Sequence, residues 1–390
     1  MKTHTLLFLM IFFSSCSQNA TFNAFSRKQG PPRDRNWTLV WNDEFEGKSW
    51  DTTKWFPSGG RWYLPDIKTE HSDQSLFLDG KGNLIIRVSK TEDGTLLYNN
   101  GLTSYYEKAY GYFEARVQFS TEPGWWTAFW LSGHPYGEGD DCFTYPQEFD
   151  IHEDFYKPKK ENDIQQCYHA NAGLLQGVET GEYGKEDIMN LNEIRRHSLP
   201  KKYILDTYEG WHTVALEWTP LEHIFYIDGK ENFRMDYREC PITNVPQKLW
   251  VSGCFRTPKD SADAFFYGLA KYGNWPDQVV FDYVRVYDQD WGNKIAPLVK
   301  VKTVDNQLNI NPGEGVRFQV NANDDDGTIQ TLYLFSRGRI RAEIDVNTSK
   351  IEHTFSISNL FPGENTIIAM AKDNDGRVGQ SEMIRVNVSE

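Results

Sequence analysis

Residues 111–120 read GYFEARVQFS, and this alternation of apolar and polar residues decides the fold class. Successive side chains of an extended chain point to opposite faces, so one face carries the apolar residues Phe113, Ala115, Val117 and Phe119. The opposite face carries Tyr112, Glu114, Arg116 and Gln118. We therefore expect a β-strand that packs its apolar face against a hydrophobic core.

Similar short strands are expected further along the chain. Alternation recurs from Trp211 to Thr219, and the next run, His223 to Asp228, ends at the hairpin turn pair Asp228-Gly229. A last strand is expected at Val279–Tyr287. The pattern of about ten strands predicts an all-β chain whose first domain is a two-sheet sandwich or jelly roll.

One of these strands holds an unusual concentration of acids, Glu148-Phe149-Asp150-Ile151-His152-Glu153. In a regular strand Glu148 and Asp150 share one face, whereas Glu153 falls on the apolar side with Phe149. One extra residue near Ile151 or His152, accommodated as a β-bulge, brings Glu153 onto the acid face and turns His152 away. The spacing therefore predicts a bulge.

Three like charges on one face raise the pKa of one carboxyl group and leave the others ionised. Glycoside hydrolysis needs this division, because one carboxylate acts as nucleophile and one protonated carboxyl acts as general acid. Two other interpretations stay open on these residues alone. One is a solvated acidic face, and the other is a cation site, which is weakened because the bulge turns His152 away.

The composition limits the classes of partner. The 390 residues carry a formal net charge of −14, with a pI near 5.2, which argues against a nucleic-acid partner. Aromatic residues make up 15% of the chain and include 13 Trp, and their flat rings suit sugars as well as β-sandwich cores. A neutral polymer therefore fits the whole-chain charge better than a polyanion.

Residues 1–16 form a targeting segment rather than part of the fold. Lys2 precedes the apolar run Leu6–Phe13, and Ser14-Ser15-Cys16 follows at once. This order resembles a bacterial lipoprotein signal, in which Cys16 is lipidated and becomes the mature N-terminus; an ordinary secretory signal is the alternative. We expect a flexible tether at residues 17–36 and a location in the bacterial cell envelope, as an outer-membrane lipoprotein exposed at the surface, although the membrane face stays open.

Export makes disulfides feasible among the remaining cysteines, Cys142, Cys167, Cys240 and Cys254. The sequence does not decide between bridges and buried thiols, nor between the three pairings that four cysteines allow.

The chain changes character after Tyr287. We expect residues 37–290 to form the jelly roll and residues 291–298 to form a linker. Residues 299–390 are expected to form a second, smaller β-sandwich. Two acidic turns, Asp324-Asp325-Asp326-Gly327 and Asp373-Asn374-Asp375-Gly376, occupy corresponding positions in it. The segment resembles the immunoglobulin-like modules of bacterial secreted enzymes, and turn chemistry explains its acids without calcium, which is the alternative.

Several motifs occur in order between residues 37 and 288: Trp41-Asn42-Asp43-Glu44-Phe45, Tyr110–Arg116, Gly124–Leu131, the acid motif, Trp211-His212, Glu217-Trp218-Thr219, Tyr226–Gly229 and Phe281–Tyr287. Together they resemble glycoside hydrolase family 16, which includes laminarinases, mixed-linkage glucanases, agarases, porphyranases and carrageenases. The resemblance implies a β-jelly-roll sandwich of the concanavalin-like type, whose concave sheet forms an open cleft for a polysaccharide. It also implies a retaining, endo-acting hydrolase that requires no cofactor, with Glu148 as nucleophile, Glu153 as general acid/base and Asp150 as the charge neighbour that tunes them.

The resemblance also suggests residues that contact the substrate. Trp126 and Trp130 match the family's tryptophans beside the cleaved bond, while strand parity places Trp125 on the opposite face. His169 looks like the residue paired beside the acid motif, and Arg61 and Trp62 lie in an early loop that suits a subsite.

Other expectations are less specific. Family members often hold one structural calcium ion near the residues that match Glu44 and Asp282. We expect a monomer that prefers a β-1,3- or mixed-linkage glucan to agar, porphyran or carrageenan, although Thr127 and His152 depart from the family's usual pattern and leave the substrate open. A non-catalytic glycan-binding lipoprotein and a transglycosylase on the same scaffold are the alternative functions.

Overall fold

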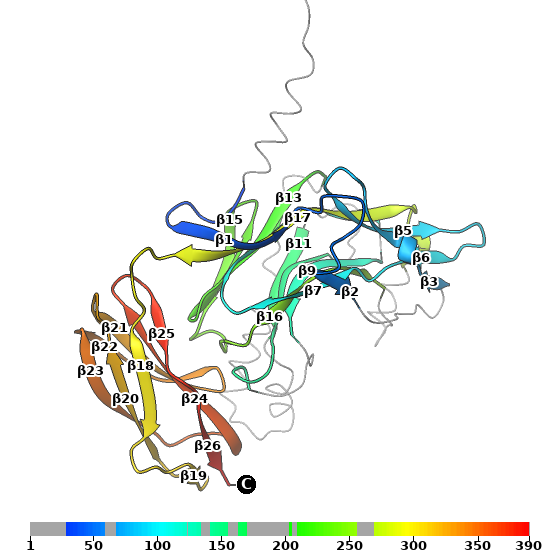
Figure 1. Cartoon of the computed structure of the whole chain (residues 1–390). Coiled ribbons are helices and arrows are strands. Elements are labelled where there is room, and N and C mark those ends of the chain that lie inside the picture. Colours follow the sequence, from blue (N-terminus) through cyan, green and yellow to red (C-terminus); the bar gives the residue numbers. More distant parts are fainter. Residues whose placement is uncertain are drawn as a thin grey trace, which may run out of the picture.

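The computed structural model describes residues 29–58, 68–122, 124–133, 141–154, 163–169, 203–204, 209–255 and 269–389. Within these ranges the regular structure is β-strand, apart from two short 3₁₀-helices, η1 (Asp73–Ser75) and η2 (Leu269–Tyr272). The strands form two sandwiches (Figure 1). The predicted all-β class is therefore confirmed. In the described ranges no helix is long and apolar enough to cross a membrane.

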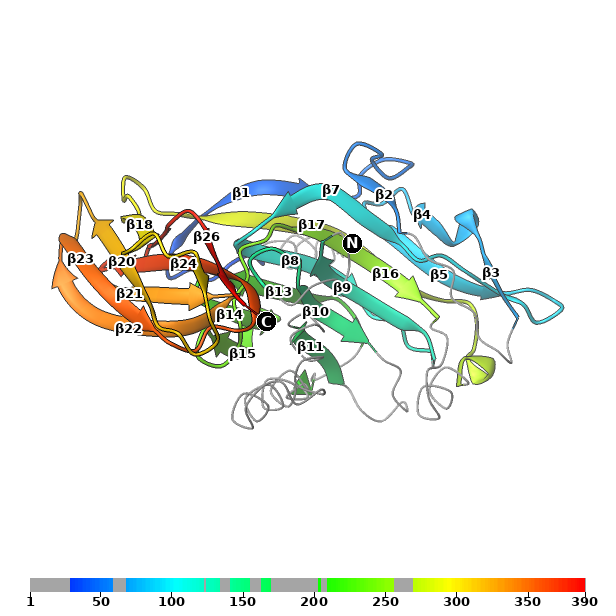
Figure 2. The same ribbon diagram turned by 90° about the horizontal axis from the view of Figure 1, so that it is seen from below.

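The first sandwich contains a ten-stranded and a seven-stranded sheet. The larger sheet has the order β15 (Lys230–Asp236), β14 (Glu222–Ile227), β13 (His212–Trp218), β8 (Gly111–Gln118), β17 (Asp277–Asp290), β5 (Leu84–Lys90), β6 (Leu96–Tyr98) and β3 (Thr69–His71), with β1 (Asn36–Asp43) on β17 and β4 (Leu76–Leu78) on β5. The smaller sheet has the order β12 (Tyr203–Ile204), β11 (Asp163–His169), β10 (Glu148–Asp154), β9 (Trp126–Ser132), β16 (Gln247–Cys254), β7 (Leu102–Lys108) and β2 (Trp55–Pro57). Figure 2 shows β7, β16, β9, β10 and β11 side by side.

The strand that was predicted from the alternation of residues 111–120 is present as β8, and its apolar face is buried. Phe113, Ala115 and Val117 are 0% exposed and lie in the core cluster of the first sandwich. The predicted hairpin is also confirmed, because β14 and β15 join at Asp228 and Gly229, whose φ angles of 49° and 71° are those that such a two-residue turn requires. Local sequence therefore determines both the strand faces and this turn.

The other face of β8 is buried as well, which the alternation alone did not predict. Over it lies a second apolar cluster that includes Tyr112, Ala215, Ile224 and Tyr226, with Trp37 and Tyr287 packed against them. Glu114 is 0% exposed under this cluster and accepts hydrogen bonds from the hydroxyl groups of Tyr112 (3.2 Å) and Tyr283 (2.8 Å). Burial raises the pKa of Glu114 to about 7, because the charged carboxylate is poorly solvated there.

Replacing Glu114 by glutamine should make the stability of the protein less dependent on pH. The folded-state pKa is raised from 4.5 to about 7, so the protonated carboxyl stabilises the fold at low pH and that contribution is lost as the pH rises through this window. The loss in free energy of unfolding is on the order of 3 kcal/mol in wild type and should be absent in Glu114→Gln. Urea unfolding at about pH 5 and pH 8 measures it. Glu92→Gln, at an exposed turn, is the matched control and should keep the wild-type dependence; an equal dependence in Glu114→Gln would contradict the raised pKa.

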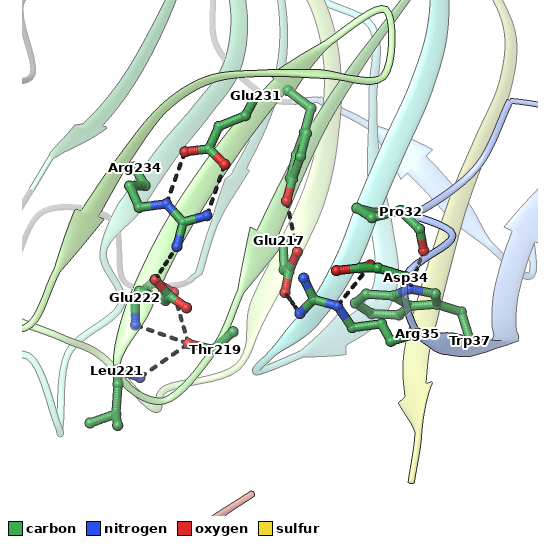
Figure 3. Close-up of polar contacts among 11 residues, drawn as sticks. Pro32, Asp34, Arg35, Trp37, Glu217, Thr219, Leu221, Glu222, Glu231 and Arg234 are labelled. Carbon is green, nitrogen blue, oxygen red and sulfur yellow. Dashed lines mark hydrogen bonds and ion pairs between the residues drawn. The ribbon is translucent and has the colours of Figure 1, made fainter. Parts of the chain in front are cut away.

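The expected tether is not flexible along its whole length. Residues 29–33 line a surface pocket together with residues of the first sandwich, and β1 already begins at Asn36. The guanidinium of Arg35 pairs with the buried carboxylate of Glu217 at 2.6 Å, and Trp37 donates its ring N–H to the carbonyl of Pro32 at 3.1 Å (Figure 3). A buried carboxylate needs such a partner, which explains why the chain is held here. Residues 17–28 lie outside the described ranges.

The second sandwich has a three-stranded and a six-stranded sheet. The smaller sheet has the order β18 (Leu298–Thr303), β20 (Val316–Asn323) and β23 (Lys350–Ile357). The larger one has the order β19 (Asn309–Ile310), β26 (Ile384–Val388), β24 (Gly363–Asp373), β21 (Ile329–Ser336) and β22 (Arg339–Thr348), with β25 (Val378–Gln380) on β24. The two acidic turns meet, since Asn374 donates its backbone N–H to the carbonyl of Thr328 at 2.9 Å.

The two sandwiches share an apolar cluster, so the second one is not an independent appendage. Its members are Phe143, Leu221, Tyr237 and Ile242 from the first sandwich, and Tyr333, Phe335, Ile368 and Met370 from the second. The rings of Tyr237 and Tyr333 lie 5.1 Å apart, and Gln380 donates to the hydroxyl of Tyr110 at 2.6 Å. Shared burial of this kind holds two domains in one relative orientation.

The cysteines form no disulfide among the described residues. Cys142, Cys167 and Cys240 are buried thiols, and Cys254 is a half-buried one. Burial raises the pKa of the Cys240 thiol well above its ordinary value, which makes it a poor nucleophile.

Candidate active site

The predicted bulge is present in β10. Asp150 pairs with Trp130 of β9 and His152 pairs with Phe129, so two steps along β10 match one step along β9. On the other side Asp150 pairs with Cys167 of β11, and Glu153 pairs with Gln165, so three steps match two. The extra residue therefore lies where strand parity required it.

The bulge sorts the side chains of β10 into two groups. Phe149 and Ile151 are 0% exposed in the core cluster. Asp150 forms side-chain hydrogen bonds with both Glu148 and Glu153, which brings the three acids together. Glu148 is half-buried, whereas Asp150 and Glu153 are only 2% and 4% exposed. One open and two buried carboxyl groups thus share one face of the sheet.

The surroundings of Asp150 favour its protonated form. Burial raises its pKa well above the ordinary value, and the charge and hydrogen bond of Glu148 raise it further. The hydrogen bond with Glu153 acts in the opposite direction. A raised pKa among the three crowded acids is what the sequence predicts, and the structure shows it at Asp150, in the middle of the motif. Asp150 is the most buried of the three, and desolvation is the largest cause.

His152 is a core residue rather than a ligand. It is 0% exposed, and its ring centroid lies 4.4 Å from that of Phe119. Burial lowers the pKa of His152 to about 3, so the imidazole is neutral at physiological pH. The prediction that the bulge turns His152 away from the acids is confirmed.

Aromatic side chains continue from the acids across the same face. Asp150 pairs with Trp130, which pairs with Trp250 of β16, so the three lie in one row across neighbouring strands. The rings of Trp130 and Trp250 stack with centroids 4.6 Å apart, and both are half-buried. Trp125 is 0% exposed in the core, as its parity predicted.

Trp250 was missed at the level of the sequence. It lies about 100 residues from the acid motif in the chain, and only the pairing of β16 with β9 brings it to the site. The alternating burial of Gln247–Cys254 is the local signal that places it on the open face of a strand.

For the other residues that were expected to contact the substrate or to carry the lipid, the structure gives less detail or none. The backbone of His169 pairs with Glu148, which agrees with a strand beside the acid motif. Trp126 is half-buried on β9, on the face of Trp130. Arg61, Trp62 and Cys16 lie outside the described ranges.

The predicted calcium ligands are engaged in ion pairs. Glu44 accepts two hydrogen bonds from Arg285, both at 2.8 Å, and Asp282 accepts one from Arg116 at 2.6 Å. No group of three or more acidic, histidine or cysteine residues in the described ranges has a geometry that holds a metal ion. A calcium ion would have to displace both arginines, so these residues do not fit the site that the resemblance implied.

Comparison with known families identifies the first sandwich. A family model described as "Beta-porphyranase A-D, GH16 domain" matches residues 37–288. The chain belongs to glycoside hydrolase family 16. The residues that the family model matches include every strand of the seven-stranded sheet and the whole acid motif.

The individual relatives that match this chain share 24–30% of their residues with it over the aligned part. The endo-1,3-1,4-beta-glycanase ExsH of Rhizobium meliloti (strain 1021) is 25% identical over 266 residues, which are 62% of this chain and 48% of that protein. The beta-glucanase of Rhodothermus marinus is 24% identical over 285 residues, 65% of this chain and 85% of the relative. Beta-porphyranase D of Zobellia galactanivorans is 30% identical over 162 residues, 37% of this chain and 36% of the relative. This chain thus spans about half of ExsH and about a third of beta-porphyranase D.

A solved structure is also similar to this chain. The crystal structure of SCLam, a non-specific endo-beta-1,3(4)-glucanase from family GH16, aligns with a TM-score of 0.48 and 20% identity, covering 67% of this chain and 94% of that one.

Proposed function

We propose that this chain is a retaining, endo-acting hydrolase of β-glycosidic bonds in a polysaccharide. The observation that carries the proposal is the convergence of Glu148, Asp150 and Glu153 on one face of a bulged strand in a family 16 domain. A retaining mechanism needs two carboxyl groups close together, one as nucleophile and one as general acid. The stacked pair of Trp130 and Trp250 extends from the acids and offers flat surfaces to sugar rings.

The chemistry proceeds in two displacements. Glu148 attacks the anomeric carbon while Glu153 donates its proton to the departing oxygen, so the glycosidic C–O bond breaks as the glycosyl-enzyme ester forms. Glu153 then takes a proton from water, whose oxygen attacks the same carbon and releases Glu148.

Asp150 tunes both glutamates. The directions of its pKa effects fit a chain in which protonated Glu153 donates to Asp150 and protonated Asp150 donates to Glu148. In such a chain Asp150 accepts a hydrogen bond from the general acid and donates one to the nucleophile, so it orients both carboxyl groups. The half-buried Glu148, which remains open to substrate, fits the role of nucleophile.

For the substrate we propose a β-linked galactan of the porphyran class. The family model that spans the domain describes β-porphyranases, and beta-porphyranase D is among the relatives. The preference for a neutral glucan rests on the net charge of the whole chain, which does not describe the local charge of a binding site. Three of the relatives are named as beta-glucanases, so glucans are the competing substrates.

A polysaccharide panel tests this proposal directly. Porphyran, agarose, κ-carrageenan, laminarin and mixed-linkage glucan are incubated with the full chain and with Glu148→Gln, and the new reducing ends are measured. We expect release from porphyran, with oligosaccharides of mixed size from the earliest times because the cleavage is internal. The hydrolase proposal fails if the wild type releases no more than the variant from any polymer, and release from laminarin alone would overturn the substrate class.

We also propose that the chain is a lipoprotein of the bacterial outer membrane and that its second sandwich is an immunoglobulin-like module. The order of Leu6–Phe13 and Cys16 supports the first statement, and the nine strands β18 to β26 in two sheets support the second. Labelled palmitate should enter the wild type but not Cys16→Ser when each is expressed in a Gram-negative host. Equal labelling of both would exclude Cys16 as the lipid site.

A further inference from the structure

The chain that leads into the catalytic strand is held by the second sandwich. Asp141 is 6% exposed, and its carboxylate accepts hydrogen bonds from the hydroxyl of Thr366 on β24, at 2.9 and 2.7 Å from its two oxygens. The same carboxylate accepts the N–H of Phe143 at 2.9 Å, and the carbonyl of Asp141 accepts the N–H of Tyr145 at 2.9 Å. Thr366 thus holds the residue that organises the turn just before Glu148.

A hairpin of the second sandwich reinforces this contact. Arg337 and Gly338 form the turn between β21 and β22, with φ angles of 51° and 86°. The carbonyl of Arg337 accepts the N–H of Cys142 at 3.4 Å, and that of Gly338 accepts the N–H of Ile242 at 2.9 Å. A Cβ atom at position 338 would lie 2.4 Å from the carbonyl oxygen of Ile242, so the turn is seated against the first sandwich too closely for a side chain. Arg337 also donates its N–H to the carbonyl of Thr366 at 3.0 Å, which joins both contacts in one network.

Glu148 depends on this support because it lies at the end of its strand. Its backbone pairs with His169 on β11, whereas the register with β9 begins only at Phe149. The direction in which the chain reaches Glu148 is therefore set by residues 141–147. Pro146 and Gln147 are buried, and a Cβ atom on Gly133 would lie 2.6 Å from the Cβ atom of Pro146, so the segment has little room to shift.

We infer that the second sandwich positions the nucleophile, with Thr366 as a positioning residue that acts through Asp141 on Glu148. This inference rests on the proposed function of Glu148. A reacting carboxylate must be held to within a fraction of an ångström, and a displacement of about 1 Å costs up to roughly 10²-fold in rate. Substrate that binds along the row of Trp130 and Trp250 does not need that accuracy, so a loosened Glu148 should lower kcat far more than it raises KM.

The test compares three full-length variants. Thr366→Val keeps the shape of the side chain and removes its hydroxyl, Thr366→Ser keeps the hydroxyl, and Thr331→Val removes a hydroxyl that bonds Asp345 within the second sandwich at 3.2 Å. The kcat is expressed per active site, counted by trapping the glycosyl-enzyme with a 2-deoxy-2-fluoro glycoside of the substrate sugar. We expect kcat of Thr366→Val to fall about 10-fold with KM within about 2-fold of wild type, while the other two variants stay within about 2-fold in both constants.

The outcomes separate the two proposals. An active wild type whose kcat per trapped site is unchanged by Thr366→Val, even if the unfolding temperature falls, would overturn the positioning role alone. A wild type that is inactive on every glycan would overturn the proposed function. If Thr366→Val does not fold, Asp141→Asn keeps the volume and one acceptor oxygen of the same contact and is judged by the same fall in kcat.

Discussion

Replacing Glu148 by glutamine should lower kcat on the polysaccharide by at least about 10³-fold, the largest effect that we expect from any single substitution. The amide has the same shape but cannot attack the anomeric carbon as an anion, so the first displacement stops. The fold should not suffer. Glutamine keeps a side-chain oxygen that can accept the hydrogen bond from protonated Asp150, and Glu148 is only half-buried. The unfolding temperature of Glu148→Gln is therefore expected to stay close to that of wild type.

The matched control is Glu107→Gln. Glu107 belongs to β7 in the same sheet, is exposed, and pairs with Lys248 at 3.2 Å, so its loss should change kcat by no more than about 2-fold. Glu148→Ala adds a chemical test, because azide can enter the space of the missing carboxylate and attack the anomeric carbon of an activated aryl β-glycoside. One inversion then gives an α-glycosyl azide. A β-glycosyl azide from this variant would contradict the assignment of Glu148 as nucleophile.

Replacing Glu153 by glutamine should lower kcat on the polysaccharide by about 10²- to 10⁴-fold, the usual contribution of a general acid. The loss should depend on the leaving group. A sugar hydroxyl leaves poorly without a proton, whereas a dinitrophenolate leaves without one. The first displacement on a dinitrophenyl glycoside should therefore proceed in Glu153→Gln at nearly the wild-type rate, and the glycosyl-enzyme should accumulate because no base activates water.

Azide also separates the roles of the two glutamates. In Glu153→Ala it should accelerate breakdown of the glycosyl-enzyme and give a β-glycosyl azide through two inversions, since this anion needs no general base. An equal loss on the polysaccharide and on the dinitrophenyl glycoside would show that Glu153 does not act as the acid. Burst kinetics on the aryl glycoside measure both steps in one experiment.

Local patterns in the sequence were enough to predict the strand faces and the bulge. Side chains in a strand alternate with a period of two, so the spacing of Glu148, Asp150 and Glu153 admits a common face only with one extra residue. The motif order between residues 37 and 288 pointed to the family, which the family model confirmed. Both inferences depend on neighbours in the chain or on order along it.

Features that depend on long-range packing were not predictable in this way. Trp250 reaches the acids through the pairing of β16 with β9. Glu114 belongs to a face that alternation alone leaves polar, but the rings around Trp37 and Tyr226 cover it and raise its pKa. The raised pKa of Asp150 is caused chiefly by burial, which strand parity does not measure. The contact of Thr366 with Asp141 joins residues 225 positions apart.

The stereochemistry of the first product tests the central claim most directly, because two successive displacements by Glu148 and water restore the original configuration. The measurement is proton NMR of the new reducing end, recorded within minutes of adding enzyme to the polysaccharide that it cleaves, before the anomers equilibrate. The mechanism predicts that the β-anomer appears first and the α-anomer only later. If the α-anomer appears first, water has attacked the substrate directly, and Glu148 is not the nucleophile of a retaining enzyme.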